Sequence, residues 1–263
     1  MNRYAWCAPP IPCLSTVPGQ RTKLKDYGCA AAPPGPTRFT AVMVDREGRA
    51  VDGSTSGSAS GDFAREIARR MVDWFVTGTE EVTADALTAQ LRTTHAALAT
   101  DFRTDSASYS LLLLEATGPA LVLHAGDCLV GRHKEDGRIA WLMQPYTLAN
   151  PLLPVAIESV AKDPARHRLT RSFRSKRFIA PDLNWIQLDD RPLLVATDGF
   201  WAELDAYQQV DFIKRRVGVV EQERDDCGAL SILRGKSGSG IELIDAEAAP
   251  NLYARADKPN LRR

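Results

Sequence analysis

Four aspartates lie where an apolar stretch of the sequence meets a turn, and they are the residues best suited to chemistry. They are spread over most of the 263 residues: Asp26, Asp52, Asp198 and Asp225. Hard divalent cations take carboxylate, carbonyl and water oxygens as ligands. Two metal ions about 4 Å apart need several negative oxygens to hold them. The spread therefore predicts one metal site that the fold assembles from distant parts of the chain.

The clearest of these residues is Asp198, which ends the apolar run 192–197 and is followed by Gly199. An aspartate in this position points its carboxylate out of the end of a strand, and the glycine lets the backbone approach a ligand. Asp-Gly is also a common turn pair, so a plain turn is the alternative for Asp198. The long apolar run before Asp198 favours its role as a metal ligand.

Asp52-Gly53 repeats this arrangement earlier in the chain, but a neighbouring acid competes with it. Asp45 ends the longer strand, which we expect over Arg38–Val44. The tetrad Asp45-Arg46-Glu47-Gly48 suits a hairpin turn, and no glycine follows Asp45 directly. These features favour Asp52 as the ligand and leave Asp45 as the alternative.

The composition is that of an ordinary globular protein, with 44% hydrophobic and 25% charged residues. Lysine plus arginine and aspartate plus glutamate both number 33, so no global field attracts nucleic acid or an anionic membrane. No apolar run is long enough to span a membrane, and the N-terminus lacks the apolar core of a signal peptide. We therefore expect a cytoplasmic protein. The five widely spaced cysteines favour reduced thiols over a zinc site.

The periodicity predicts strands first, then two adjacent helices, then more strands around one further helix. Helices are expected from residue 62, over 83–99 and over 202–217, and strands over 38–44, 109–116, 120–124, 129–133, 139–143, 185–188, 193–197, 228–233 and 241–244. Residues 145–182 carry prolines and a basic stretch, and we expect an irregular excursion. This order favours an α+β fold of two packed antiparallel β-sheets flanked by helices. We expect an N-terminal arm over 1–14, one domain over 15–250 and a frayed tail over 251–263.

Five places in the sequence resemble the metal-dependent protein phosphatase family of the 2C type, in its compact bacterial branch. These are the segment from Arg21 to Asp26, the Asp-Gly and glycine-serine segment 51–62, Ala125-Gly126-Asp127 with Asp136-Gly137, the segment 147–153 with Asn150, and Ala196–Trp201 with Asp225-Asp226. The similarity runs from about Ser15 to Leu233. Each piece is a weak signal, but the combination is specific.

The resemblance implies a role for each matched residue in the first half of the chain. Arg21 would grip the phosphate, and Asp26 would support the metal site. Asp52 would bridge both metal ions, and the carbonyl of Gly53 would be a further ligand. Lys25 stands where an acid or an amide is usual, which places a cation beside the site.

The remaining matched residues are the other implied metal ligands. Asp198 and Asp225 would each supply one carboxylate to the second metal ion, and Asp127 would serve a third ion at a weaker site. The choice of Asp225 over Asp226 rests on the resemblance, because the two are physically interchangeable. The implied cofactor is Mn²⁺ or Mg²⁺, two ions with room for a third.

The resemblance implies a bacterial serine/threonine protein phosphatase in signalling, in which a water that bridges two metal ions attacks the phosphate monoester. Its partners would be a phosphorylated protein substrate and a cognate kinase. The basic stretch 166–177 is a solvated surface, or it steers a phosphorylated or acidic partner. Lys25, with Gly228 and Ala229 in place of hydroxyl and β-branched residues, keeps a second hypothesis open. In that case the chain is a catalytically weak or inactive regulator that binds phosphoproteins or a partner protein.

Overall fold

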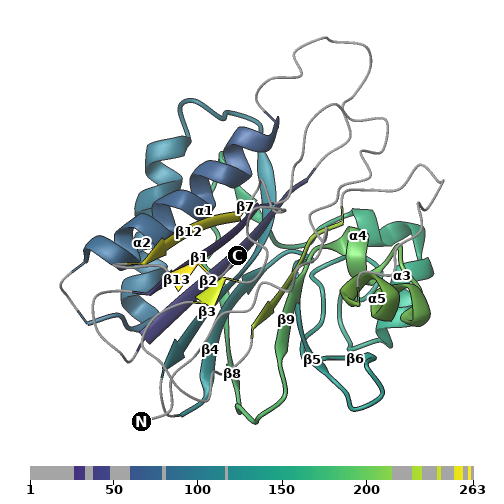
Figure 1. The fold of residues 1–263 in the computed structure, drawn as a ribbon. Coiled ribbons are helices and arrows are strands. Elements are labelled where there is room, and N and C mark those ends of the chain that lie inside the picture. The colour runs from purple at the N-terminus through teal and green to yellow at the C-terminus, as the bar shows by residue number, and fades with distance from the viewer. Residues whose placement is uncertain are drawn as a thin grey trace.

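Two β-sheets lie face to face in the structure, with helices on the outer side of each (Figure 1). The structure is a computed structural model, and it describes residues 27–32, 38–47, 60–78, 81–115, 118–214, 227–232, 242–243, 252–256 and 260–261. The α+β sandwich expected from the sequence is confirmed. Its layers run helix, sheet, sheet, helix.

The larger sheet has the strand order β12-β1-β2-β3-β4-β8, and β7 pairs with the start of β3. All of its neighbours are antiparallel except β1 and β12, which are parallel. Its strands are β1 (Tyr27–Ala32), β2 (Arg38–Glu47), β3 (Ser106–Glu115), β4 (Ala120–Ala125), β7 (Phe173–Arg174), β8 (Asp182–Ile186) and β12 (Leu252–Ala256).

The smaller sheet has the antiparallel order β10-β9-β5-β6. Its strands are β5 (Leu129–His133), β6 (Ile139–Trp141), β9 (Leu193–Ala196) and β10 (Ala229–Ile232). Two further short strands, β11 (Glu242–Leu243) and β13 (Asn260–Leu261), pair with each other. The chain passes from the larger sheet to the smaller between β4 and β5, returns between β6 and β7, and passes to the smaller sheet again between β8 and β9.

Helices α1 (Ser60–Thr77) and α2 (Ala84–Leu98) cover the outer face of the larger sheet (Figure 1). The apolar stripe expected on the first helix is confirmed, because Phe63, Ile67, Met71 and Phe75 are all buried. The second helix begins where the sequence predicts, since the Thr83 hydroxyl accepts a hydrogen bond of 3.1 Å from the Ala86 amide.

The helix predicted over residues 202–217 is confirmed from Ala206 to Ile213, but its predicted start is wrong. The structure forms two short helices, α4 (Asp198–Trp201) and α5 (Ala206–Ile213), and residues beyond 214 lie outside the described part there. Asp205 separates them as an N-cap, accepting hydrogen bonds of 2.9 Å from the amides of Tyr207 and Gln208. The Gln208 side chain accepts a bond of 3.0 Å from the Asp205 amide, which completes a capping box.

Two other expectations differ from the structure. β2 continues through Asp45 to Glu47, where the sequence predicted a hairpin turn, because pairing with β3 extends to Glu47 opposite Ser106. Leu252–Ala256 forms β12 on the edge of the larger sheet, where we expected a frayed tail. The excursion 145–182 is largely irregular as expected, with only α3 (Ile157–Lys162), a 3₁₀ turn (Pro164–His167), β7 and the start of β8.

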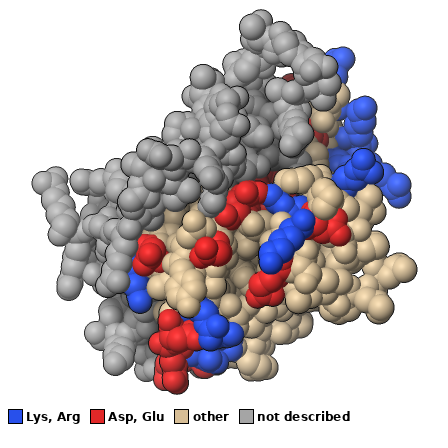
Figure 2. Space-filling model, turned by 90° about the vertical axis from the view of Figure 1, so that its right-hand side faces the viewer, with Lys and Arg blue, Asp and Glu red and all other residues tan. Residues whose placement is uncertain are grey.

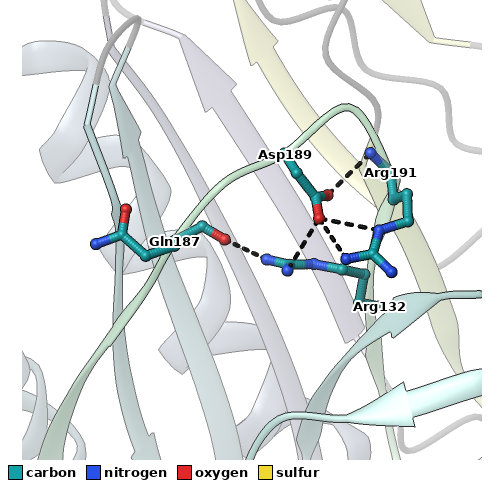
Figure 3. A network of polar contacts seen from close by, with 4 residues as sticks. All are labelled: Arg132, Gln187, Asp189 and Arg191. Carbon is teal, nitrogen blue, oxygen red and sulfur yellow. Dashed lines mark hydrogen bonds and ion pairs between the residues drawn. The ribbon is translucent and has the colours of Figure 1, made fainter.

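A polar clamp holds the β8–β9 connection against β5 at one end of the sandwich (Figure 3). Arg132 donates to the Asp189 carboxylate at 3.2 Å and to the backbone carbonyl of Gln187. Asp189 also accepts a bond of 2.9 Å from Arg191 Nε, and this arginine lowers the pKa of the Asp189 carboxyl. These contacts join the two sheets at the end of the β5–β9 ladder where Arg132 pairs with Leu193, opposite the end where Leu129 pairs with Ala196.

Candidate functional site

Strand register brings Asp127 and Asp198 to the same end of the smaller sheet. Leu129 pairs with Ala196 in an antiparallel ladder, so the residues two positions outside this pair, Asp127 and Asp198, lie opposite each other. A direct bond supports this placement, because Trp201 Nε1 donates to the Asp127 carbonyl at 2.8 Å. Both aspartates are buried, with exposed fractions of 3% for Asp127 and 6% for Asp198. The two sequence-predicted ligands that the structure describes are therefore neighbours.

The backbone at Gly126 explains how Asp127 is positioned. Gly126 has φ +98°, and a Cβ there would lie 2.0 Å from the Ser108 hydroxyl oxygen and 2.7 Å from the Ser108 Cα. Only glycine fits this approach without displacing β3. The same hydroxyl accepts a hydrogen bond of 3.0 Å from the Asp127 amide. The serine thus fixes the tight turn from β4 toward β5.

Asp45 also lies at this end of the sandwich, although the sequence favoured Asp52. Asp45 pairs with Ser108 across β2 and β3. Alternation along β2 puts Asp45 on the same face as Ala41 and Met43, which pack between the two sheets. Its exposed fraction is 9%. The signal for Asp45 in the sequence was the longer apolar strand that precedes it.

Asp198 begins α4, directly after β9, and the preceding residue ties it to the next strand. The Thr197 amide donates to the Gly228 carbonyl at 2.9 Å, and the Gly228 amide donates to the Thr197 hydroxyl at 2.9 Å. The end of β9 and the start of β10 are therefore joined beside Asp198. Sequence periodicity predicted strand β9 and its end, but the hydrogen bonds between Thr197 and Gly228 depend on the pairing of β9 with β10.

Arg166 is a site residue that sequence reasoning missed. Its Nη1 donates to Asp198 Oδ2 at 2.9 Å, and its Nη2 donates to the Glu203 carboxylate. The Arg166 side chain is 7% exposed. We expected the basic stretch to be solvated, but its first arginine turns inward from the 3₁₀ turn and neutralises two carboxylates. The arginine fixes the orientation of the Asp198 carboxylate.

A second polar cluster lies behind the Gly126 turn, around His124 on β4. The His124 ring lies 5.0 Å from that of Tyr146, whose hydroxyl donates to Asp182. Arg171 also contacts Asp182, and the Tyr146 amide donates to the Gly126 carbonyl at 2.9 Å. Burial lowers the pKa of His124 to about 4. The histidine is therefore neutral near pH 7, which argues against it as a proton donor.

The donor chemistry of the site suits hard divalent cations, because Asp45, Asp127 and Asp198 are carboxylates at the same end of the sandwich. Within the described part of the chain, no cluster of three or more His, Cys, Asp or Glu side chains could hold a metal ion by itself. The other predicted site residues, Arg21, Asp26, Asp52, Gly53 and Asp225, lie outside the described residues. The described carboxylates are thus of the chemical type that binds a divalent metal ion.

Several solved phosphatase structures share this fold. A serine/threonine phosphatase from S. agalactiae has a TM-score of 0.60 at 15% identity, covering 81% of this chain and 93% of its own. Stp1 from Staphylococcus aureus has a TM-score of 0.62 at 15% identity, and the match covers 83% of this chain and 91% of Stp1. MsPP, a PPM Ser-Thr phosphatase from Mycobacterium smegmatis in complex with cacodylate, has a TM-score of 0.60 at 17% identity. The match covers 81% of this chain and 92% of MsPP. The chain has the fold of PPM, or protein phosphatase 2C type, phosphatases.

Comparison at the level of sequence finds no matching family model and no matching curated protein. The likeness is therefore carried by the arrangement of the elements. Among the helices that the structure describes, none combines the length and the apolar character needed to cross a membrane.

Proposed function

We propose that this chain, which has the PPM phosphatase fold, is a metal-dependent phosphoprotein phosphatase that hydrolyses phosphoserine and phosphothreonine monoesters. The observation that carries the proposal is the meeting of Asp127 and Asp198, two separately predicted metal ligands, at one end of the sandwich. The fold shared with serine/threonine phosphatases supports the reaction class. Its substrate would be a phosphorylated bacterial protein in the cytoplasm, with a cognate kinase as the opposing enzyme.

Two Mn²⁺ or Mg²⁺ ions, when bound, would lower the pKa of a bound water and neutralise charge on the phosphate. Asp198 would hold these ions, together with Asp225 and either Asp52 and the Gly53 carbonyl or Asp45, and Asp127 would hold a third ion at a weaker site. Asp26 would support them.

Arg21 would hold the phosphoryl oxygens in a bidentate fork, which orients the phosphorus for in-line attack. Among the described residues, Arg166 orients the Asp198 carboxylate and Ser108 holds the Asp127 amide. The reaction requires no covalent intermediate with the protein.

One observation favours a second candidate function. The Arg166 guanidinium already neutralises the Asp198 carboxylate, which would otherwise be free to attract a cation. Together with Lys25, this pairing suits a regulator that keeps the phosphatase fold and binds phosphoproteins or a partner protein with weak or no catalysis. The two candidates differ in whether Asp198 binds a metal ion.

Hydrolysis by metal-stripped protein separates them. We would restore Mn²⁺, Mg²⁺ or Ca²⁺ and measure turnover of para-nitrophenyl phosphate and a phosphothreonine peptide. The control for Asp198→Asn is Asp136→Asn, because Asp136 is also followed by glycine but lies in the exposed β5–β6 turn. We expect Mn²⁺ to restore turnover in the native chain and in Asp136→Asn but not in Asp198→Asn. A folded native chain without turnover under every metal would support the regulator.

A further inference from the structure

A short basic segment lies on the rim of the candidate site and is not used by the chemistry proposed above. Five of the ten residues from 168 to 177 are arginine or lysine, and none is acidic. Arg171 forms an ion pair with Asp182. The other four cations are exposed, and we call them the basic rim: Arg168, Arg174, Lys176 and Arg177.

The backbone of this segment is firmly held. Leu148 donates to the Arg168 carbonyl at 2.9 Å, and β7 pairs with the first two residues of β3. Beyond β7, the Ser175 amide donates to the Asp105 carbonyl at 3.0 Å. The four cations therefore project from a fixed frame, so a bound partner would not need to order the backbone.

The charges of the basic rim are not neutralised within the described part of the chain, where none of its four side chains forms an ion pair with a carboxylate. Arg174 is held by neutral groups, with Nε 3.1 Å from the Ser172 hydroxyl and Nη2 3.2 Å from the Leu169 carbonyl. By contrast, acidic and basic side chains are interspersed over the face beside α3 and α5 (Figure 2). The basic rim therefore produces a local positive potential, although the formal net charge of the whole chain is zero.

The basic rim is close to the metal-ligand candidates. Arg174 pairs with Ser106, two residues before Ser108, whose hydroxyl accepts the Asp127 amide. Two residues along a strand advance about 7 Å, and one strand spacing adds about 5 Å at right angles. The Arg174 backbone is therefore about 9 Å from Ser108. An extended peptide covers that distance in about three residues.

We propose that the basic rim binds acidic side chains of the phosphoprotein substrate, two to three residues from the phosphorylated serine or threonine. This inference rests on the proposed function and adds a substrate class to it. Charge complementarity selects an acidic peptide as the occupant. Nucleic acid is disfavoured because the one aromatic residue of the segment, Phe173, is buried and offers no surface for base stacking.

The test compares two phosphothreonine peptides that differ only in glutamate or glutamine at the second and third flanking positions. We would measure kcat/KM for the native chain, for Lys176→Gln/Arg177→Gln, and for the control Lys134→Gln/Arg138→Gln. The control removes the same charge at the β5–β6 turn, at the far end of the sandwich. Para-nitrophenyl phosphate, which has no flanking residues, serves as the reference substrate.

We expect the native chain to prefer the acidic peptide, and the rim variant to lose roughly 3- to 10-fold of that preference, as removal of two exposed ion pairs predicts. The preference should also weaken as salt shortens the Debye length below about 10 Å. The control variant should keep the preference, and all three proteins should hydrolyse para-nitrophenyl phosphate equally. An unchanged acidic-to-neutral ratio in the rim variant would overturn the proposal.

A binding measurement separates failure of the rim from failure of the proposed function. Fluorescence anisotropy of the labelled acidic phosphopeptide on Asp198→Asn protein needs no turnover. If the native chain hydrolyses nothing, the rim still predicts roughly 3- to 10-fold weaker peptide binding when Lys176→Gln/Arg177→Gln is added to Asp198→Asn. Equal binding by both proteins would overturn the rim. Rim-dependent binding of an RNA oligonucleotide or of anionic vesicles that exceeds binding of the peptide would overturn the choice of occupant.

Discussion

Replacement of Arg166 with methionine should destabilise the protein strongly. Arg166 bridges Asp198 and Glu203, and the exposed fractions of the Arg166 and Asp198 side chains are 7% and 9%. Methionine fills similar volume but leaves the buried Asp198 carboxylate without its guanidinium partner. Removal of one member of a buried ion pair costs about 3 to 5 kcal/mol. Because Glu203 is 27% exposed and can regain water, we expect the lower end, about 3 kcal/mol.

Thermal and urea unfolding of metal-stripped protein measure this loss. For a chain of this size, about 3 kcal/mol corresponds to a fall in Tm of roughly 6 to 12 °C. Arg168→Met is the matched control, because this arginine lies two residues further on and is exposed. Its effect on the free energy of unfolding should stay within about 0.5 kcal/mol.

A double-mutant cycle assigns the loss to the pair with Asp198. Asp198→Asn removes the charge that Arg166 neutralises, so the double variant should be more stable than the sum of the single effects by about 1 to 3 kcal/mol. If Arg166→Met unfolds at the same urea concentration as the native chain, or if the two effects simply add, the reasoning about the buried pair is refuted. Mn²⁺ should raise the Tm of Arg166→Met more than that of the native chain, since a cation would then meet an uncompensated carboxylate.

Two further predictions follow from Gly126 and His124. Gly126→Ala should cost about 4 kcal/mol of unfolding free energy, because strain at positive φ and the contact with Ser108 add, whereas Gly118→Ala, with the same φ of +98° and open space, should cost about 1 to 2 kcal/mol. Equal losses in urea unfolding would show that β3 yields to the new methyl group. The pKa of His124 is lowered from 6.5 to about 4, so the unfolded chain takes up its proton first as the pH falls. Stability should therefore decline between about pH 6.5 and pH 4, by up to about 3 kcal/mol, and His124→Gln should remove that part of the slope in urea titrations.

The sequence predicted the elements whose signals are local. The stripe of α1 and the bounds of β5 follow from the spacing of apolar residues, and both are confirmed. The break after α4 also had a local signal, the Asp205 and Gln208 capping box, which the longer apolar periodicity concealed. Asp45 shows the opposite case, because its turn-forming neighbours were overridden by pairing with β3.

The candidate site was predictable only where it coincides with the end of an element. Asp198 ends an apolar run, whereas Asp127 was predicted only through the family resemblance, and strand register brings the two together. Arg166 carried no signal of this kind, since its partner lies 32 residues away and only the packing of the 3₁₀ turn against α4 brings them into contact. Whether a basic residue in a polar stretch is buried or exposed depends on contacts with residues far away in the sequence, which periodicity does not encode.

The parallel pairing of β12 with β1 has a practical consequence for handling the protein. Tyr253 anchors β12, because its hydroxyl donates to Asp73 at 2.8 Å and its ring lies 4.7 Å from the Arg69 guanidinium carbon. Truncation before Leu252 would uncover the hydrogen-bonding edge of β1, whose residues are small and largely apolar. Such an edge recruits strands from other molecules and promotes aggregation. Affinity tags at the C-terminus are therefore better carried on a polar spacer after Leu261 than fused directly to β12.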